Sequence, residues 1–118
     1  MVLDSKGKLW GVGNNDCGQI GTGESEELVF DPTCVGVAGV KFKDVACGGI
    51  HVMALTDAGE VFSWGNGKTG RLGHGNEDDE LSPKRIEYFV ERGIKIERIV
   101  AGGGQSFAID GKNRLGNT

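Results

Sequence analysis

The stretch LTDAGEVFSWGNGKTGRLGHG, residues 55–75, has a counterpart earlier in the same chain, LDSKGKLWGVGNNDCGQIGTG, residues 3–23. The two stretches are offset by 52 positions throughout. Self-similarity at a fixed period is the signature of a repeat architecture. Five glycines coincide under this offset: Gly7, Gly13, Gly18, Gly21 and Gly23 match Gly59, Gly65, Gly70, Gly73 and Gly75.

The repeat continues downstream with small changes in length. Each copy has an acidic segment, at 24–27 and 77–80, followed by a proline, Pro32 or Pro83. KFKDVACGGIHVMAL then matches KIERIVAGGGQSFAI at an offset of 54. Two units therefore fill the chain. The expected division is a first repeat or blade equivalent at 1–58, a second at 59–110, and a tail or start of a third repeat at 111–118.

Each unit is typical of short strands joined by tight turns. Strands are expected at 41–47, 51–56, 60–64 and 95–101, and Asp57-Ala58-Gly59 supplies a hairpin turn between two of them. The two prolines are expected at the start of a further extended piece, around Cys34–Val37 and Lys84–Tyr88. In the second unit, the segment Tyr88–Gly93 predicts one helical turn closed by Gly93. Glycine accounts for 22 of 118 residues, which favours turns over long helices.

The strand at 61–64 is apolar on both faces. Phe62 and Trp64 share one face and Val61 projects from the other. In the first copy, Trp10 and Val12 share a face, with Leu9 opposite. Because strands of this kind must be covered on both sides, the sequence predicts an all-β stack of small antiparallel sheets. A propeller closes such a stack into a ring.

These residues carry a family resemblance. The pattern G-x-L/V-x-x-W/V-G-x-G/N…G-Q/R-L/I-G-x-G, followed by A-C/G-G-G-x-x-x-x-A-L/I, resembles the repeat of the regulator of chromosome condensation family. The resemblance covers essentially the whole chain. It implies antiparallel blades of a β-propeller that normally has seven blades, of which about two are expected here. We expect a fragment of a longer propeller, or a chain that self-associates to protect its exposed sheet edges.

The composition limits the classes of partner. The formal net charge is −4, so the chain has no overall basic field for nucleic acid or an anionic membrane, and neither is expected as a partner. No apolar run approaches the length of a transmembrane segment. The three cysteines, Cys17, Cys34 and Cys47, lack paired spacing, which favours reduced thiols in a cytoplasmic or nuclear protein.

Residues 65–70, GNGKTG, contain a literal G-x-G-x-x-G and a Lys-Thr pair, the pattern of a phosphate-binding loop. The first copy reads GNNDCG there, and a dinucleotide loop also needs a helix that RLGHG at 71–75 hardly supplies. We therefore interpret the repeated glycines as structural positions that need positive φ and close packing. They are Gly13, Gly18, Gly21, Gly23, Gly65, Gly70, Gly73 and Gly75.

Other candidates for chemistry are weaker. Cys47 and His51 would share a strand face about 13 Å apart, and the second copy has Ala101 and Gln105 in their places. The cysteines and histidines show no metal-ligand spacing. Ser63, Ser82 and Ser106 have no partner base that the sequence identifies. No catalytic residue, cofactor or metal is expected, and the chain is not expected to be an enzyme.

The acidic segments are the candidate partner-binding site. Equivalent loops of neighbouring blades project from the same edge of a propeller, so these carboxylates are expected to line one rim and attract a basic partner. The alternative is that solvated turns are simply acidic. The candidate residues are Glu24, Glu26, Glu27, Glu77, Asp78, Asp79 and Glu80.

The resemblance implies protein binding. Members of the family act as exchange factors for small GTPases, as chromatin-associated proteins, or as scaffolds within ubiquitin ligases and kinases. The main expectation is a protein–protein interaction module. The alternative is part of a guanine nucleotide exchange factor, or the propeller scaffold of a ubiquitin ligase or kinase.

Overall fold

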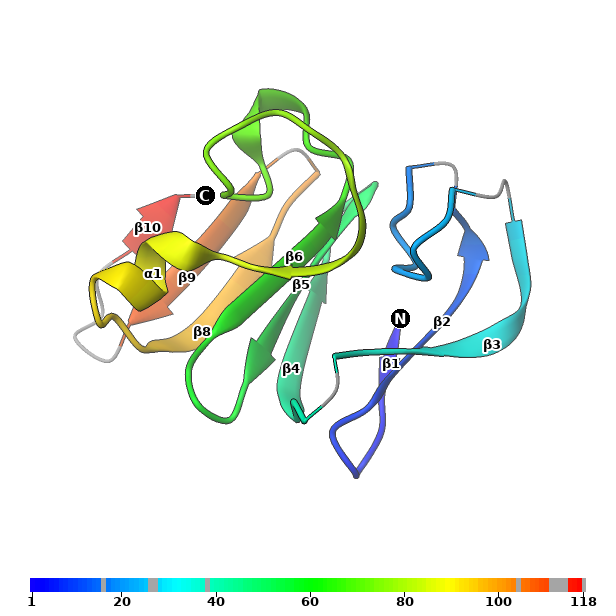
Figure 1. Ribbon diagram of the computed structural model, residues 1–118, viewed down its shortest axis with the longest axis horizontal. Helices are drawn as coiled ribbons and strands as arrows, with labels where there is room; N and C mark the ends of the chain where they lie inside the picture. The colour runs from blue at the N-terminus through cyan, green and yellow to red at the C-terminus, as the bar shows by residue number, and fades with distance from the viewer. Residues whose placement is uncertain (16, 26–27, 38, 104, 111–114, 118) are drawn as a thin grey trace.

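Three antiparallel sheets stand side by side (Figure 1). The computed structural model describes residues 1–118 except 16, 26–27, 38, 104, 111–114 and 118. The first sheet has the strand order β1-β2-β3, the central sheet β4-β5-β6-β7, and the third β10-β9-β8. The strands are β1 Val2–Leu3, β2 Leu9–Asn14, β3 Leu28–Val35, β4 Phe42–Cys47, β5 His51–Thr56, β6 Val61–Gly65, β7 Glu80–Arg85, β8 Ile96–Ala101, β9 Ser106–Asp110 and β10 Leu115–Asn117.

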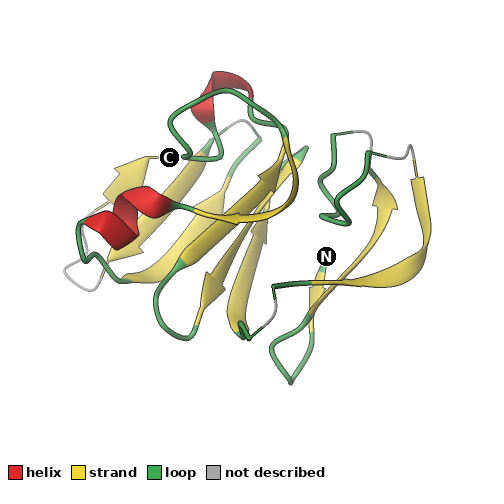
Figure 2. Ribbon diagram, viewed as in Figure 1, coloured by secondary structure: helices red, strands yellow, loops and turns green. Residues whose placement is uncertain are grey.

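Strands and turns dominate the described residues, as Figure 2 shows. The helical elements among them are a single 3₁₀ turn, η1 at Lys68–Gly70, and a short helix, α1 at Glu87–Glu91. The predicted all-β architecture is confirmed. The predicted helical turn is also present, and it is followed by Gly93 at a φ of +64°.

The sheets are joined by the same backbone contact at two places. The amide of Phe42 donates a 3.0 Å hydrogen bond to the carbonyl of Gly7, in the turn between β1 and β2. One repeat later, the amide of Ile96 donates a 3.0 Å bond to the carbonyl of Gly59, in the turn between β5 and β6. Each hairpin turn is therefore tied to the beginning of the next sheet, which gives neighbouring sheets the same relative placement.

The two faces of the central sheet lie in two separate cores. Phe62 and Trp64 face the first sheet and are buried with Leu9 and Phe42. The rings of Phe42 and Phe62 meet edge to face, with their centroids 5.6 Å apart. On the opposite face, Val61 packs with residues of the third sheet. Full burial of such a side chain contributes about 1.5–3 kcal/mol, so these two interfaces hold the stack together.

The sequence units and the sheets do not coincide. The expected boundary between residues 58 and 59 falls in the turn between β5 and β6, inside the central sheet. That sheet takes β4 and β5 from the first unit and β6 and β7 from the second. A repeat of the sequence is therefore not a blade. Each unit contributes strands to two neighbouring sheets, which links the sheets covalently as well as by packing.

Both prolines lie inside strands rather than at their start. The outer strands cover 28–35 and 80–85, earlier in the chain than the expected pieces around Cys34–Val37 and Lys84–Tyr88. Pro32 and Pro83 are tolerated there because β3 and β7 are edge strands. An edge strand has unpaired backbone positions, and a proline at such a position costs no ladder hydrogen bond.

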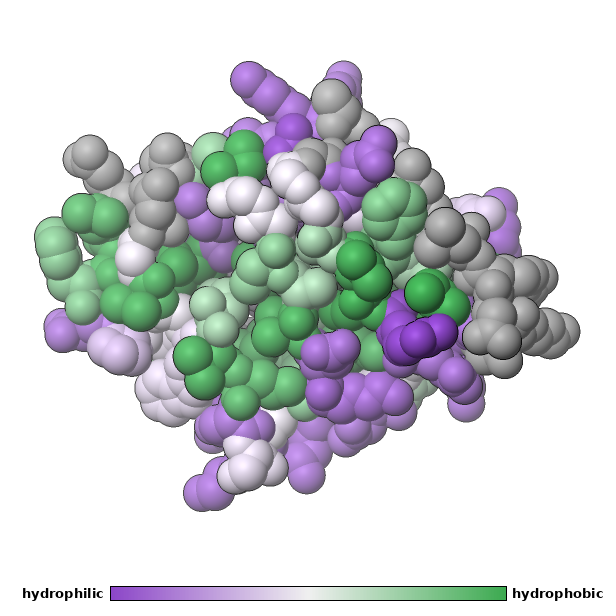
Figure 3. All heavy atoms as spheres, turned by 180° about the vertical axis from the view of Figure 1, so that it is seen from behind, coloured by the Kyte–Doolittle hydropathy of each residue, from purple (hydrophilic) through white to green (hydrophobic). Residues whose placement is uncertain are grey.

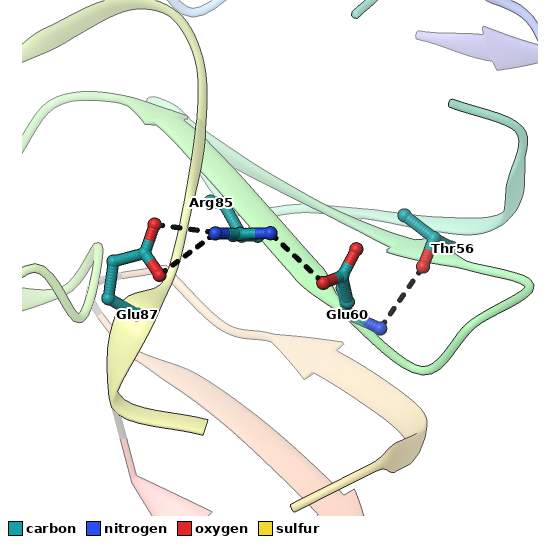
Figure 4. Close-up of polar contacts among 4 residues, drawn as sticks. All are labelled: Thr56, Glu60, Arg85 and Glu87. Carbon is teal, nitrogen blue, oxygen red and sulfur yellow. Dashed lines mark hydrogen bonds and ion pairs between the residues drawn. The ribbon is translucent and has the colours of Figure 1, made fainter. Parts of the chain in front are cut away.

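Arg85 fastens the end of β7 to its surroundings (Figure 4). Its guanidinium pairs with Glu60 at 3.1 Å and with Glu87 at 3.2 Å. Glu60 begins the β6 side of the hairpin, and its amide donates a 3.1 Å hydrogen bond to the Thr56 hydroxyl. Glu87 is the first residue of α1. One cation therefore bridges the β5–β6 turn and the helix.

The last described strand follows the pattern of the central sheet. Leu115 in β10 pairs with Ile109 in β9. Val61 in β6 pairs with Leu55 in β5, which is the equivalent position one repeat earlier. The segment thus begins a third hairpin in the same register, although its sequence lacks the aromatic-glycine ending of the earlier copies.

Candidate functional site: two acidic loops at one rim

The glycine-rich loops that follow β2 and β6 carry the acidic segments. All eight repeat glycines, two near the ends of these strands and six in the loops, have positive φ, between +70° and +108°. At Gly21 the reason is also steric, because an added Cβ would lie 2.8 Å from both Trp64 Nε1 and Val35 Cγ1. The indole N–H of Trp64 in turn donates a 3.0 Å hydrogen bond to the Gln19 carbonyl. The first loop is therefore seated on the central sheet.

The first loop also contacts the beginning of β7, next to the second acidic segment. The amide of Gly23 donates a 2.7 Å hydrogen bond to the carbonyl of Leu81 in β7. Gly18 lies so close to Leu81 that an added Cβ would be 2.8 Å from its Cα. Glu24 directly follows Gly23, and Glu80 directly precedes Leu81. The fold thus brings Glu24 of the first repeat and Glu80 of the second to one side of the molecule.

A buried asparagine fixes the first loop. The side-chain amide of Asn15, with no exposed surface, donates a 3.0 Å hydrogen bond to the Glu24 carbonyl. The amide of Ile20 donates a 3.0 Å bond to Asn15 Oδ1. Asn15 was not among the sequence candidates. The difference between the two copies could have indicated this residue, because Gly67 stands at the equivalent position of the second unit.

The second loop is fixed from the acidic segment itself. The amide of Gly67 donates a 2.8 Å hydrogen bond to Asp79 Oδ1, and an added Cβ on Gly67 would lie 1.9 Å from the Asp78 carbonyl oxygen. The amide of Lys68 donates a 3.0 Å bond to Asn66 Oδ1. These two amides of the G-x-G-x-x-G stretch are therefore engaged within the protein. Gly67 allows close packing against Asp78, and its amide and that of Lys68 are not available to cradle a phosphate.

The carboxylates of the rim differ in their surroundings. Asp79 stabilises the loop, and Glu80 pairs with Lys84 at 3.5 Å. Glu24, Glu77 and Asp78 are exposed. Glu26 and Glu27 lie outside the described residues. Within the described part of the rim, the side chains of Glu24, Glu77 and Asp78 are thus accessible to solvent.

Ser63 and His74 form a close pair that has the wrong polarity for a nucleophile. Ser63 Oγ lies 2.6 Å from the Leu72 carbonyl and 2.9 Å from His74 Nε2. The carbonyl can only accept, so the serine proton points to Leu72, and the imidazole must donate to Ser63 through Nε2. A general base would instead need an unprotonated Nε2 that accepts the proton of the serine hydroxyl. The pair holds the loop after β6 onto the sheet.

His51 joins the central sheet to the third sheet. Its Nε2 lies 2.8 Å from Ser106 Oγ, and both side chains are buried. Burial, followed by the nearby charge of Arg71, lowers the pKa of His51 below its ordinary value. Cys47 is exposed, whereas His51 is buried. The histidine therefore serves the interface between sheets and not a thiol–imidazole pair.

Within the described ranges, no group of three or more His, Cys, Asp or Glu side chains is arranged to hold a metal ion. The described helices also include none that is long and apolar enough to span a membrane.

Comparison with family models and curated proteins gives consistent matches. The model described as the regulator of chromosome condensation (RCC1) repeat matches residues 6–55 and 58–109, and a second model of that repeat matches residues 42–71. The Protein RCC2 homolog of Danio rerio is 36% identical over 116 residues, which is 98% of this chain and 23% of that protein. The Ultraviolet-B receptor UVR8 of Arabidopsis thaliana is 38% identical over 85% of this chain and 22% of that protein.

Longer proteins and solved structures match as well. The human E3 ubiquitin-protein ligase HERC2 is 32% identical over 90% of this chain, which is 2% of that protein. The crystal structure of human WBSCR16 superposes with a TM-score of 0.85 at 26% identity, over 96% of this chain and 28% of that one. Saccharomyces cerevisiae Prp20p, described with its binding properties to Gsp1p and histones, has a TM-score of 0.80 at 29% identity, over 90% of this chain and 27% of that one. The chain spans about a quarter of the length of several of these proteins, including the RCC2 homolog and Prp20p.

Proposed function

Because the chain belongs to the regulator of chromosome condensation (RCC1) repeat family, we propose that it is a protein–protein interaction module whose acidic rim binds a basic protein surface. The observation that carries the proposal is the 2.7 Å hydrogen bond from Gly23 to Leu81. This bond brings Glu24 of the first acidic segment and Glu80 of the second to one side of the molecule, which supports a partner shared by the two segments.

The charges of the rim support this function in two ways. Exposed carboxylates on one face attract a basic partner over a distance and favour one orientation of docking. The loops that carry them are fixed by the buried Asn15 and by the bond from Gly67 to Asp79. A prearranged loop loses little conformational freedom on binding, which favours affinity.

Similar proteins support a partner of this kind. Prp20p is described with binding properties to histones, which are basic proteins. Because the same relative is described with Gsp1p, a role within a guanine nucleotide exchange factor for a small GTPase is the second candidate. The match to the ligase HERC2 supports the alternative of a scaffold within a longer enzyme. In each case the module binds and positions proteins, in the cytoplasm or the nucleus, and does no chemistry itself.

The test uses charge reversal at the rim. Glu24, Glu77 and Asp78 are changed together to Lys, and binding to purified core histones is measured at increasing salt. We expect the variant to lose much of its binding, because the reversed charges no longer attract a basic partner. The binding that remains should depend less on salt, because fewer charge pairs are left for salt to screen, and the Debye length is about 10 Å at 0.1 M salt.

The matched control reverses the same number of charges elsewhere. Asp57, Glu91 and Glu97 are exposed and lie outside the rim. Their change to Lys alters the net charge equally and should weaken binding far less. Equal loss from both triple variants would show a general charge effect and would contradict a localised site. The exchange alternative is measured separately, as GDP release from small GTPases.

A further inference from the structure

Lysines gather where the first sheet meets the central sheet. Lys6 and Lys8 belong to the turn between β1 and β2, and Lys41 and Lys43 flank the first residue of β4. All four residues are exposed. The turn and the beginning of β4 lie at the lower edge of the molecule in Figure 1, and hydrophilic residues follow that edge in Figure 3, which shows the opposite face. Lys6, Lys41 and Lys43 are called the lysine patch below.

The hydrogen bond between the two sheets fixes the spacing of the lysine patch. The Phe42 amide donates to the Gly7 carbonyl at 3.0 Å. Lys6 directly precedes Gly7, whereas Lys41 and Lys43 stand on either side of Phe42. Gly7 lies so close to the central sheet that an added Cβ would be 3.1 Å from Lys41 Cβ. The backbone therefore holds the lysines on both sides of this seam in place without a partner.

The lysine patch surrounds a depression in the surface. The hollow has a volume of about 280 Å³ and lies between the β1–β2 turn, the β5–β6 turn and the beginning of β4. All three lysines of the patch line it. Within the part of the chain that the structure describes, none of these three lysines forms an ion pair. Their ammonium groups are thus available to an anion that enters the hollow.

Two carboxylates also line the depression, Asp4 and Asp57. Asp4 is engaged by its own turn, because its Oδ1 accepts hydrogen bonds from the amides of Lys6 at 2.8 Å and Lys8 at 3.0 Å. Its Oδ2 accepts a 3.0 Å bond from the indole N–H of Trp10. Asp57 is exposed. Four lysines against two carboxylates leave an excess of positive charge here, on a chain whose net charge is −4.

The second repeat shows that the fold does not require this excess. The same seam recurs between the central and third sheets, where the Ile96 amide bonds to the Gly59 carbonyl and an added Cβ on Gly59 would lie 3.0 Å from Lys95 Cβ. The positions equivalent to Lys6, Lys8, Lys41 and Lys43 carry Ala58, Glu60, Lys95 and Glu97. Only the lysine that packs against the glycine is kept. Because clustered like charges repel one another, the additional lysines at the first seam cost stability and need another reason.

We propose that the lysine patch binds an acidic segment of a partner protein, with carboxylates of that segment paired to Lys6, Lys41 and Lys43. Asp and Glu side chains are small enough to enter the hollow. The excess of positive charge attracts such a segment and the fixed spacing of the lysines orients it. A long nucleic acid would need a wider basic surface, because its affinity comes from many phosphate contacts and the chain as a whole is acidic.

The lysine patch lies at the end of the strands opposite to the acidic rim. β2 begins at Leu9, beside the turn that carries Lys6, and ends at Asn14, where the first acidic loop begins. A strand of this length separates the two surfaces by about 16 Å. A basic partner at the rim and an acidic segment at the patch can therefore be bound at the same time. The inference goes beyond the proposed function and does not rest on it.

The test measures binding of a fluorescently labelled hexaglutamate peptide by anisotropy at low salt, with hexaglutamine as the neutral peptide. Lys6→Gln, Lys41→Gln and Lys43→Gln are combined in one variant. Its affinity for hexaglutamate is expected to fall about tenfold, because three exposed ion pairs of modest strength are lost. All three side chains are exposed, so the variant should fold, as circular dichroism can verify.

The matched control removes the same charge elsewhere. Arg92, Lys95 and Arg98 are exposed and lie outside the patch, and their combined change to Gln should leave the affinity nearly unchanged. The rim variant, with Glu24, Glu77 and Asp78 changed to Lys, should bind hexaglutamate at least as tightly as the unchanged chain. This arm separates the patch from the proposed function, which concerns the rim.

Nuclear magnetic resonance locates the peptide. The amide signals of Gly7, Phe42 and Asp57 are expected to shift on addition of hexaglutamate, whereas those of the rim should not. No binding by the unchanged chain, equal loss in the two Gln variants, or shifts confined to other residues would overturn the proposal. A single-stranded oligonucleotide of equal charge that binds the patch more tightly than the peptide would overturn it in favour of nucleic acid.

Discussion

The indole N–H of Trp64 donates a 3.0 Å hydrogen bond to the carbonyl of Gln19, across the interface between the first loop and the central sheet. The indole is fully buried. Its neighbour in the loop is Gly21, at which an added Cβ would lie 2.8 Å from Trp64 Nε1. The absence of a side chain at Gly21 therefore leaves the space that the Trp64 indole occupies.

Gly21→Ala should destabilise the protein more than Gly23→Ala. Both glycines have a φ of +93°, so a side chain brings the same backbone strain to each, about 1–2 kcal/mol. Gly23 has nothing within 4 Å of an added Cβ, so the difference between the variants reports the contact with Trp64. Overpacking of this kind costs about 1–3 kcal/mol more. The free energies of unfolding in urea measure it, and equal losses would show that the indole moves aside.

Gly67→Ala should be destabilising although the φ of Gly67 is −98°, a value that alanine adopts without strain. The cause is the Asp78 carbonyl, which an added Cβ would approach to 1.9 Å. We expect a loss of about 1–3 kcal/mol from displacement of the acidic segment. Gly36→Ala is the control, because nothing lies within 4 Å there. Chemical denaturation compares the two, and a neutral Gly67→Ala would show that the acidic segment is not held at Gly67.

The stability of the protein should fall as the pH falls from about 7 to about 5. Burial lowers the pKa of His51 below its ordinary value of 6.5, and burial also lowers the pKa of His74. As the pH falls through that ordinary value, the unfolded chain binds protons before the folded one does, so unfolding is favoured by up to about 1.4 kcal/mol per pH unit for each histidine. His51→Gln, which places at 51 the residue found at 105, should flatten the dependence of the urea midpoint on pH. An unchanged slope would assign the effect to other groups.

Arg85→Ala should produce a small loss of stability that disappears at high salt. Its ion pairs with Glu60 and Glu87 involve side chains that are between 33% and 54% exposed, so solvent screens them. At about 1 M salt the Debye length is about 3 Å and the pairs contribute little. Thermal melts at low and high salt measure the change. A loss that persists at high salt would show that Arg85 acts through packing instead.

Strands β4, β5, β6 and β8 and the hairpin that joins β5 to β6 were predictable from the sequence. Alternation of Val61, Phe62 and Trp64 predicted a strand with two buried faces, and the structure places these residues in two separate cores. The positions of β3 and β7 were not predictable from the prolines, because a proline disfavours a central strand but fits an edge strand. Which strand is an edge is decided by the assembled sheet.

The sequence by itself determined the repeat, because turns that need positive φ leave a spaced pattern of glycines that survives other changes. It also determined the all-β class, because alternation and turn chemistry are local properties of the chain. Only the tertiary structure decided that a repeat is shared between two sheets, that Asn15 and Asp79 fasten the loops, and that Leu81 packs against Gly18. These are contacts between residues far apart in the chain, and their energy depends on distances that no local pattern contains.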